Sequence, residues 1–393
     1  MTFYQSLSAA GFAATAIGYG PARMGFGLFV PEFRETFELS TSTIGFISSL
    51  GFFGFLLGLL LAQLLLNLRG PEAPVVVGLA AAAAGMAIIA AAPGPMILAG
   101  GVFLAATSAG FAWTPFNDAV HRKVRQSDRP AALATVSTGT SFGVCVAGLT
   151  ALGPLVGGIS WRYCWAGFAA AAVLVLIGNL MSLRQVEKSP HATPRGGWRH
   201  LRHGKARPLF LTAFVFGTSS AIYIAFAADH ARGTGGPEGL PAAAAPALIF
   251  VSYGIFGLIG LGAGRLRARL GLSRLLRLSM AAGACSALLI AFAATSWAGL
   301  IASAGLQGIH VMVTSALIAS WSEELFPSLP SLSFTAALLA MAAGSVLGAA
   351  LGGVAADAVG PAIMFLGAAL LPAAAALLLR GGAVREEPIA SEE

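Results

Sequence analysis

Long apolar stretches, separated by short polar connections, run through the whole chain. A helix that crosses a bilayer needs about 20 mostly apolar residues, because the hydrocarbon core is about 30 Å thick. Stretches of this kind lie at 6–30, 41–66, 74–92, 95–120, 130–153, 161–183, 208–229, 243–264, 273–294, 296–321, 330–356 and 360–380. Because only helices and closed barrels satisfy every backbone polar group in lipid, the pattern predicts an all-α membrane protein with twelve transmembrane helices.

The composition agrees with this prediction. Hydrophobic residues make up 57% of the chain and charged residues only 10%, whereas a soluble protein carries about 25% charged residues. The 50 glycines allow helices to approach closely in lipid. A net charge of +7 could suggest nucleic acid, but the charges lie in short loops between apolar segments, as membrane topology requires. We therefore expect membrane lipids as neighbours and no nucleic acid.

The basic residues predict an orientation. With both termini on the cytoplasmic side, 19 of the 23 Lys and Arg residues fall in cytoplasmic connections. The opposite side holds Arg34, Arg162 and Arg232, and Arg23 lies within a predicted helix. Positive charge concentrates on the cytoplasmic side of membrane proteins, so both termini are expected there.

One cytoplasmic connection is much longer than the others. Residues 184–207 are basic and contain prolines, and we interpret them as a linker between six-helix bundles at 1–183 and 208–380. The histidines of this segment do not predict a metal site, because a solvated or lipid-facing basic segment accounts for them. The acidic tail at 381–393 is expected to be disordered.

Two pairs of motifs recur at about half the chain length. Asn67-Leu68-Arg69-Gly70 corresponds to the segment that ends at Gly271, and the two glycines are 201 residues apart. Gly153-Pro154-Leu155-Val156-Gly157-Gly158 corresponds to the run from Gly348 to Gly353 at an offset of 195. The two offsets favour a six-plus-six duplication, which is common among transporters.

These motifs resemble those of the major facilitator superfamily, over the whole chain. Its loop signature is matched at Gly264, Leu266, Arg269, Gly271 and Arg274, but Ala268 and Asn67 replace its acidic residue. The Gly-Pro-x-x-Gly-Gly run is similar to a motif common in antiporters of the family, and the opening run from Gly18 to Pro31 resembles the bacterial YbfB/YjiJ-like subgroup. The resemblance implies gating or conformational roles for a set of motif residues: Asn67, Arg69, Gly70, Gly153, Pro154, Gly157, Gly158, Gly264, Arg269 and Gly271. Without its acidic residue, the family's usual cytoplasmic latch is not expected here.

Polar residues recur along one face of four predicted helices. The sets are Thr15, Tyr19 and Arg23; Thr107, Thr114 and Asp118; Thr212, Ser219 and Tyr223; and Ser303, Gln307, His310 and Thr314. Intramembrane polarity is costly and marks a cavity or a helix contact. The resemblance implies that these helices, at 6–30, 95–120, 208–229 and 296–321, line a central cavity. The helices at 74–92, 161–183, 273–294 and 360–380 have few polar groups and can face lipid.

Arg23 is the leading candidate for ligand binding. It is the only Lys or Arg well inside a predicted helix, where it costs about 2.5–3.5 kcal/mol on insertion scales. A guanidinium binds carboxylate through two hydrogen bonds, which predicts an anion clamp. The alternatives are a structural ion pair, with Asp118 as the candidate partner, or extension of the side chain to the outer surface. The other predicted substrate-binding residues are Tyr19, Phe26, Trp113, Asn117, Tyr223 and Gln307.

His310 and Asp118 are the candidates for proton coupling. A histidine near the middle of a helix can titrate near neutral pH, although a hydrogen-bonded helix contact is an equal alternative. Asp118 lies near the cytoplasmic end of its helix, where a gate or loop anchor is the favoured role.

The sequence predicts a secondary transporter and not an enzyme. No recognisable nucleotide, metalloprotease or paired-carboxylate motif occurs, and no cofactor or metal is expected. The favoured function is proton-linked transport of a small organic anion by a monomer in the bacterial inner membrane. The alternative is efflux of apolar compounds, suggested by the Gly-Pro-x-x-Gly-Gly motif. A membrane enzyme and a channel are less favoured.

Overall fold

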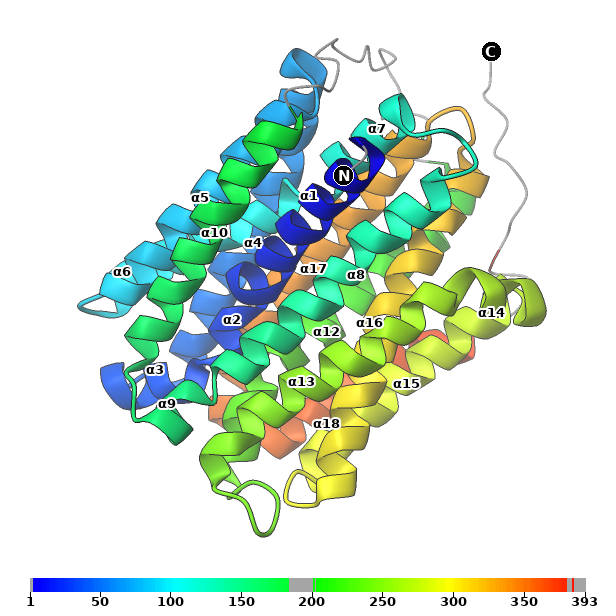
Figure 1. Cartoon of the computed structure of the whole chain (residues 1–393). Helices are drawn as coiled ribbons and strands as arrows, with labels where there is room; N and C mark the ends of the chain where they lie inside the picture. The colour runs from blue at the N-terminus through cyan, green and yellow to red at the C-terminus, as the bar shows by residue number, and fades with distance from the viewer. Residues whose placement is uncertain (1–2, 184–200, 202, 380–383, 385–393) are drawn as a thin grey trace.

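The architecture was obtained as a computed structural model, which describes residues 3–183, 201, 203–379 and 384 (Figure 1). Most of the predicted linker at 184–207 and of the predicted tail at 381–393 lies outside these residues. Within the described residues, eleven helices are long and apolar enough to cross a membrane. The first predicted span is built from three consecutive pieces: α1 (Phe3–Ile17), the π-helix η1 (Gly18–Ala22) and α2 (Arg23–Leu28). Their junctions keep helical backbone angles, so they form one further membrane-crossing rod.

The remaining elements follow the predicted order. They are α3 (Val30–Phe37), α4 (Thr41–Arg69), α5 (Glu72–Ala91), α6 (Pro95–Gly110), α7 (Trp113–Lys123), α8 (Arg129–Thr150), α9 (Gly153–Gly157), α10 (Trp161–Leu183), η2 (Gly204–Ala206), α12 (Arg207–Gly233), η3 (Ala242–Ala244), α13 (Ala245–Gly257), η4 (Leu258–Gly262), α14 (Ala263–Leu270), α15 (Leu272–Phe292), α16 (Trp297–Leu325), α17 (Pro330–Val359) and α18 (Pro361–Leu378). The all-helical membrane fold predicted from the apolar stretches is confirmed.

Two predicted helices differ in detail from those observed. The stretch at 95–120 is interrupted after α6, where Phe111 donates its backbone N–H to Ser108 at 3.1 Å and starts a turn. The stretch at 243–264 passes through the tighter helix η4 and continues as α14 to Leu270. Apolar periodicity alone does not encode either interruption.

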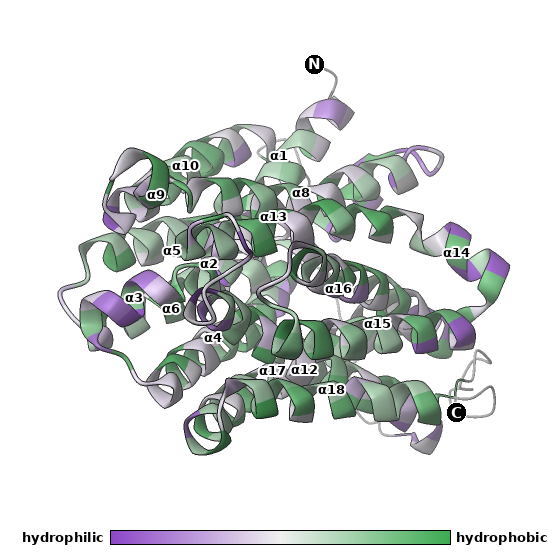
Figure 2. Cartoon of the chain, turned by 90° about the horizontal axis from the view of Figure 1, so that it is seen from below, coloured by the Kyte–Doolittle hydropathy of each residue, from purple (hydrophilic) through white to green (hydrophobic). Residues whose placement is uncertain are grey.

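The helices predicted to face lipid lie at the periphery of the bundle. The helices α5, α10, α15 and α18 carry exposed apolar side chains such as Val77, Leu174, Leu278 and Leu370. Figure 2 shows the hydrophilic residues concentrated near helix ends, for example at α3 and α14. Polar side chains within the apolar part of these outer helices are buried: Asn179 on α10 and Ser279 and Ser286 on α15. Ser286 donates a 2.7 Å hydrogen bond to the carbonyl of Ser303.

The helices before residue 184 approach those after residue 203 at backbone distance. A Cβ added to Gly27 on α2 would lie 1.9 Å from the carbonyl oxygen of Ile224 on α12. A Cβ on Gly45 of α4 would lie 2.7 Å from the carbonyl oxygen of Ala349 on α17. Small residues permit such approach in lipid, where dispersion contacts and not hydrophobicity hold helices together.

Both contacts lie toward one end of the bundle, which we call the far end. It is opposite the start of α1 and the end of α18, which we call the termini (Figure 1). Ion pairs join the two sets of helices there: Arg34 to Asp229 at 2.7 Å, Arg232 to Glu32 at 2.6 Å, and Arg232 to Glu35 at 2.5 Å. The backbone N–H of Ser42 also donates to Asp357 at 2.8 Å. The far end is therefore closed.

Candidate functional site

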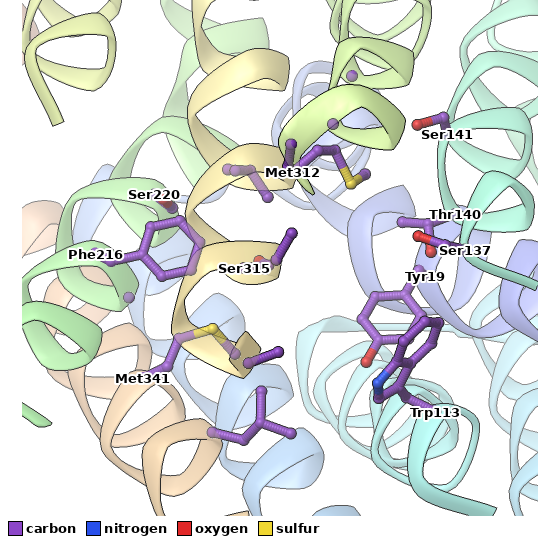
Figure 3. Close-up of a pocket in the computed structure, with 18 of the residues that line it drawn as sticks. Tyr19, Trp113, Ser137, Thr140, Ser141, Phe216, Ser220, Met312, Ser315 and Met341 are labelled. Atoms are coloured by element: carbon purple, nitrogen blue, oxygen red, sulfur yellow. The ribbon is translucent and has the colours of Figure 1, made fainter. Parts of the chain in front are cut away.

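A cavity of about 450 Å³ lies between the two sets of helices. Its main lining side chains come from η1, α2, α4, α7, α8, α12, α16 and α17: Tyr19, Arg23, Met24, Phe52, Trp113, Ser137, Thr138, Thr140, Ser141, Phe216, Ser220, Ile224, Met312, Ser315, Glu323, Leu338 and Met341. Figure 3 shows Phe216 and Met341 on one side of the cavity, with Tyr19 and Trp113 on the opposite side. The volume falls in the range of pockets that hold drug-sized molecules.

The cavity extends toward the end of the bundle that carries the termini. Gly264 in α14 and Glu323 near the end of α16 line it on that side. On the other side it stops at Met24 and Ile224, beyond which Gly27 closes against α12. The molecule is thus shut at the far end and hollow toward the termini.

A π-helix places Arg23 and Tyr19 at the cavity. Pro21 lacks a backbone N–H and cannot make the normal i→i−4 hydrogen bond, which favours the wider turn of η1. Gly20 lets this turn press against α8, because a Cβ there would lie 2.5 Å from the backbone of Gly143. The local sequence therefore positions Tyr19 and Arg23, the two side chains that this part of the chain contributes to the cavity.

Aromatic rings surround the guanidinium of Arg23. Its Cζ lies 4.1 Å from the ring centroid of Phe55, 5.5 Å from Tyr19 and 5.9 Å from Phe52. Such cation–π contacts are worth about 0.5–2 kcal/mol each, depending on desolvation, and offset part of the cost of placing the charge in the bundle. Within the described part of the chain, the buried Nε of Arg23 has no hydrogen-bond partner.

Asp118 does not pair with Arg23. Its carboxylate accepts a 2.5 Å hydrogen bond from Arg122, one helical turn further along α7. The suggested structural pair between Arg23 and Asp118 is therefore not formed. Asp118 lies in the middle of α7, one helical turn before Arg122.

The predicted substrate-binding residues divide into two groups. Arg23, Tyr19 and Trp113 line the cavity. Phe26 lies beyond Arg23, where it stacks on Phe33 at 5.5 Å and lines a separate void of about 10 Å³.

Asn117, Tyr223 and Gln307 are not among the residues that line the cavity. Asn117 lies on α7 with a buried side-chain oxygen that has no hydrogen-bond partner in the described structure. Tyr223 and Gln307 are 3% and 2% exposed, which places them inside the helix contacts and away from the ligand space of this conformation.

The polar stripe of α16 faces its helical neighbours. The Tyr223 hydroxyl lies 3.0 Å from that of Ser303, and the hydroxyl of Ser303 donates to the carbonyl of Ser286 on α15 at 2.8 Å. The Nδ1 of His310 lies 2.8 Å from the carbonyl oxygen of Ser279, also on α15. The cavity instead receives a different face of α16, which carries Met312, Ser315 and Glu323.

His310 lies directly behind the cavity wall. Its ring meets the ring of Phe216 edge to face at 5.2 Å, and Phe216 lines the cavity. The side chain is fully buried, and its Nε2 has no hydrogen-bond partner among the described residues. One aromatic side chain thus separates His310 from the ligand space.

The predicted gating residues lie at helix ends. Gly70, Gly271 and Gly158 adopt φ values of 75°, 78° and 60°, which favour glycine, at the ends of α4, α14 and α9. Asn67 accepts a 3.1 Å hydrogen bond from Gln63 within α4. The other members of this set occupy the same termini: Arg69 ends α4, Arg269 is next to last in α14, Gly264 is in the first turn of α14, and Gly153, Pro154 and Gly157 lie in α9.

Sequence reasoning missed the contribution of α8 to the cavity. Ser137, Thr140 and Ser141 line it, as do Met312 and Met341 from other helices. The run from Ser137 to Ser141 is dense in hydroxyl side chains within an apolar helix, and that local density could have indicated a cavity wall. The two methionines carry no comparable signal, because methionine is ordinary in a membrane helix.

Comparison with known proteins identifies the family to which this architecture belongs. The family model described as Major Facilitator Superfamily matches residues 11–263, and one described as MFS_1 like family matches residues 163–367. No curated protein matches the chain by sequence.

Solved structures share the fold at low identity. A variant of nucleoside transporter NupG matches at a TM-score of 0.77 and 12% identity, covering 96% of this chain and 99% of that one. A POT family transporter in complex with 5-aminolevulinic acid matches at 0.78 and 12% identity, covering 96% and 95%. A bacterial homologue of the human lysosomal transporter Spinster, in an inward-facing and unoccupied conformation, matches at 0.69 and 15% identity, covering 98% and 96%.

Proposed function

Because the chain belongs to the major facilitator superfamily, a family of secondary transporters and not of enzymes, we propose that it carries a small organic anion across the inner membrane by alternating access. The observation that carries the proposal is Arg23. Among the described residues that line the cavity it is the only cation, and it has aromatic rings but no carboxylate around it. A bound anion would supply the charge that the protein does not.

Uptake and ligand-dependent thermal stability of the purified protein test the proposal. A charged hydrogen bond is worth about 1.5–3 kcal/mol, so Arg23→Ala should weaken carboxylate binding by about 10- to 150-fold. Arg23→Lys keeps the charge but loses the bidentate geometry, so its carboxylate affinity should fall between those of the unchanged protein and Arg23→Ala. Unchanged anion affinity in Arg23→Ala would refute the assignment.

The second candidate is efflux of apolar compounds. It is favoured by the apolar wall of Phe216, Leu338 and Met341, which suits a ligand without charge. In that case neutral apolar compounds should stabilise the protein, and Arg23→Ala should leave their effect unchanged. The same thermal-shift screen therefore separates the two functions.

Proton coupling is the next part of the proposal, with His310 as the candidate proton site. Its position behind Phe216 supports a role in which ligand binding changes the surroundings of the imidazole. In proteoliposomes with an imposed pH gradient, His310→Gln should abolish accumulation and preserve exchange of labelled for unlabelled substrate. Retained pH-driven accumulation in this variant would assign the proton elsewhere, and Asp118→Asn is the next variant to test.

The orientation and organisation complete the proposal. The distribution of Lys and Arg supports a cytoplasmic location for both termini, so the described conformation would open inward. The repeated motifs support bundles at 1–183 and 208–380, and conformational roles for the motif residues at their helix ends.

The opening run from Gly18 to Pro31 supports membership of the YbfB/YjiJ-like subgroup, and the protein is proposed to act as a monomer. The hydroxyl- and methionine-bearing walls join Arg23, Tyr19 and Trp113 as substrate contacts, with Phe26, Asn117, Tyr223 and Gln307 in supporting positions.

A further inference from the structure

We propose that the cavity selects an amphipathic monoanion: one carboxylate attached to an apolar, preferably aromatic, body. This inference rests on the proposed anion transport and specifies its substrate class. Three features of the described cavity carry it: a single cation, a single carboxylate at the opposite end, and two chemically different walls.

The formal charges of the cavity limit the charge of the ligand. Arg23 and Glu323 are the only charged side chains among the described residues that line it. Arg23 lies next to the closed far end, whereas Glu323 lies near the end of α16 toward the termini. A ligand with one anionic group can place it at Arg23. A second anionic group, held toward the opening, would meet the Glu323 carboxylate, which is exposed there and repels a like charge even where water screens it.

The surroundings of Arg23 favour a compact anionic head. The rings of Phe52 and Phe55 cover the guanidinium, so few waters can compete with a ligand for its donors. The hydroxyl of Ser220, which lines the cavity on α12, is buried and has no hydrogen-bond partner among the described residues. An unpartnered buried hydroxyl gains from any partner, so rotation of the Ser220 side chain toward the cavity would give a bound ligand a further polar contact.

The walls of the cavity favour an apolar body with one polar edge. Phe216 and Met341 form one side in Figure 3, and Tyr19 and Trp113 form the other. Aromatic rings and thioethers make favourable contacts with a flat apolar group, and methionine adapts to its shape. The hydroxyls of Ser137 and Thr140 on α8 give the second wall a polar strip.

Four matched probes test this assignment by thermal shift on the purified full-length protein. They are 3-phenylpropionate, which has a ring and one carboxylate; propionate, which lacks the ring; 3-phenylpropanol, which lacks the carboxylate; and phenylsuccinate, which has a ring and two carboxylates. The dissociation constant of 3-phenylpropionate should be at least tenfold lower than that of each other probe.

Variants connect the preference to the named residues. Glu323→Gln should reduce the discrimination against phenylsuccinate severalfold. Glu324→Gln is the matched control, because the neighbouring Glu324 pairs with Arg267 and does not line the cavity, and it should keep the discrimination. Phe216→Ala should weaken the binding of 3-phenylpropionate and leave the binding of propionate unchanged.

The outcomes separate this inference from the proposed function. If propionate or phenylsuccinate binds as tightly as 3-phenylpropionate and all three lose affinity in Arg23→Ala, anion transport stands and the monoanion selection is wrong. If the alcohol binds as tightly as the acid and Arg23→Ala changes neither, both fail. Absence of Arg23-dependent binding by every probe would also overturn the selection.

Discussion

The contact of Gly27 with α12 should control closure of the far end. In Gly27→Ala, the added Cβ would lie 1.9 Å from the carbonyl oxygen of Ile224, whereas ordinary contact begins at 3.4 Å, so the two backbones must separate by about 1.5 Å. Overpacking of this kind costs about 1–3 kcal/mol. Because the cost falls only on the conformation with a closed far end, the equilibrium should shift toward far-end opening by about 5- to 150-fold.

Cysteine labelling measures this shift. In a background in which Cys145, Cys164 and Cys285 are replaced, Ser48→Cys is a nearly isosteric reporter, because Ser48 is buried beside Gly27 in the small void at the far end. Its maleimide labelling rate follows the population of the open far end while that population stays small. The rate should therefore rise by about 5- to 150-fold in Gly27→Ala.

Two controls distinguish opening from general loosening. Gly100→Ala adds the same methyl group where nothing lies within 4 Å, and it should leave the labelling rate unchanged. Ser315→Cys reports on the large cavity, and its labelling should not increase in Gly27→Ala. Equal labelling of Ser48→Cys with and without the Gly27 substitution would refute the reasoning, as would a parallel increase at Ser315→Cys.

Other contacts give further predictions. Burial raises the pKa of Glu32, against the opposing effect of Arg232, and separation of the far end would return this carboxyl to water. The raised pKa means that the closed far end is favoured at pH below the ordinary glutamate pKa. This advantage is lost as pH rises through the raised pKa. Labelling of Ser48→Cys should accordingly slow on acidification, and Glu32→Gln should remove that dependence. Tyr223→Phe removes the 3.0 Å contact with the Ser303 hydroxyl and should lower the free energy of unfolding by about 0.5–1.5 kcal/mol in denaturant titration. A decrease of more than about 3 kcal/mol would contradict this prediction. Gly70→Ala forces an alanine into φ 75° and ψ −173°, a region essentially restricted to glycine, and should cost about 1–3 kcal/mol in the same titration. Gly264→Ala, with nothing within 4 Å, should be nearly neutral.

The candidate site was only partly predictable. Arg23 stands out in the sequence because a charge inside an apolar helix is costly wherever the helix lies. Its aromatic neighbours were not predictable, since Phe52 and Phe55 lie on another helix and nothing in their own segment distinguishes them from other apolar residues.

The sequence by itself determined the membrane-spanning helices, because each span must satisfy its backbone and its lipid contacts locally, within about 20 residues. The tertiary structure decided which face of α16 lines the cavity. That helix carries polar groups on two faces, one with Gln307 and His310 and the other with Ser315 and Glu323. Only the packing of α15 and α12 buries the face with His310 and leaves the face with Glu323 at the cavity. Closure of the far end was likewise a tertiary outcome, since the contact between Gly27 and Ile224 joins helices almost 200 residues apart in the chain.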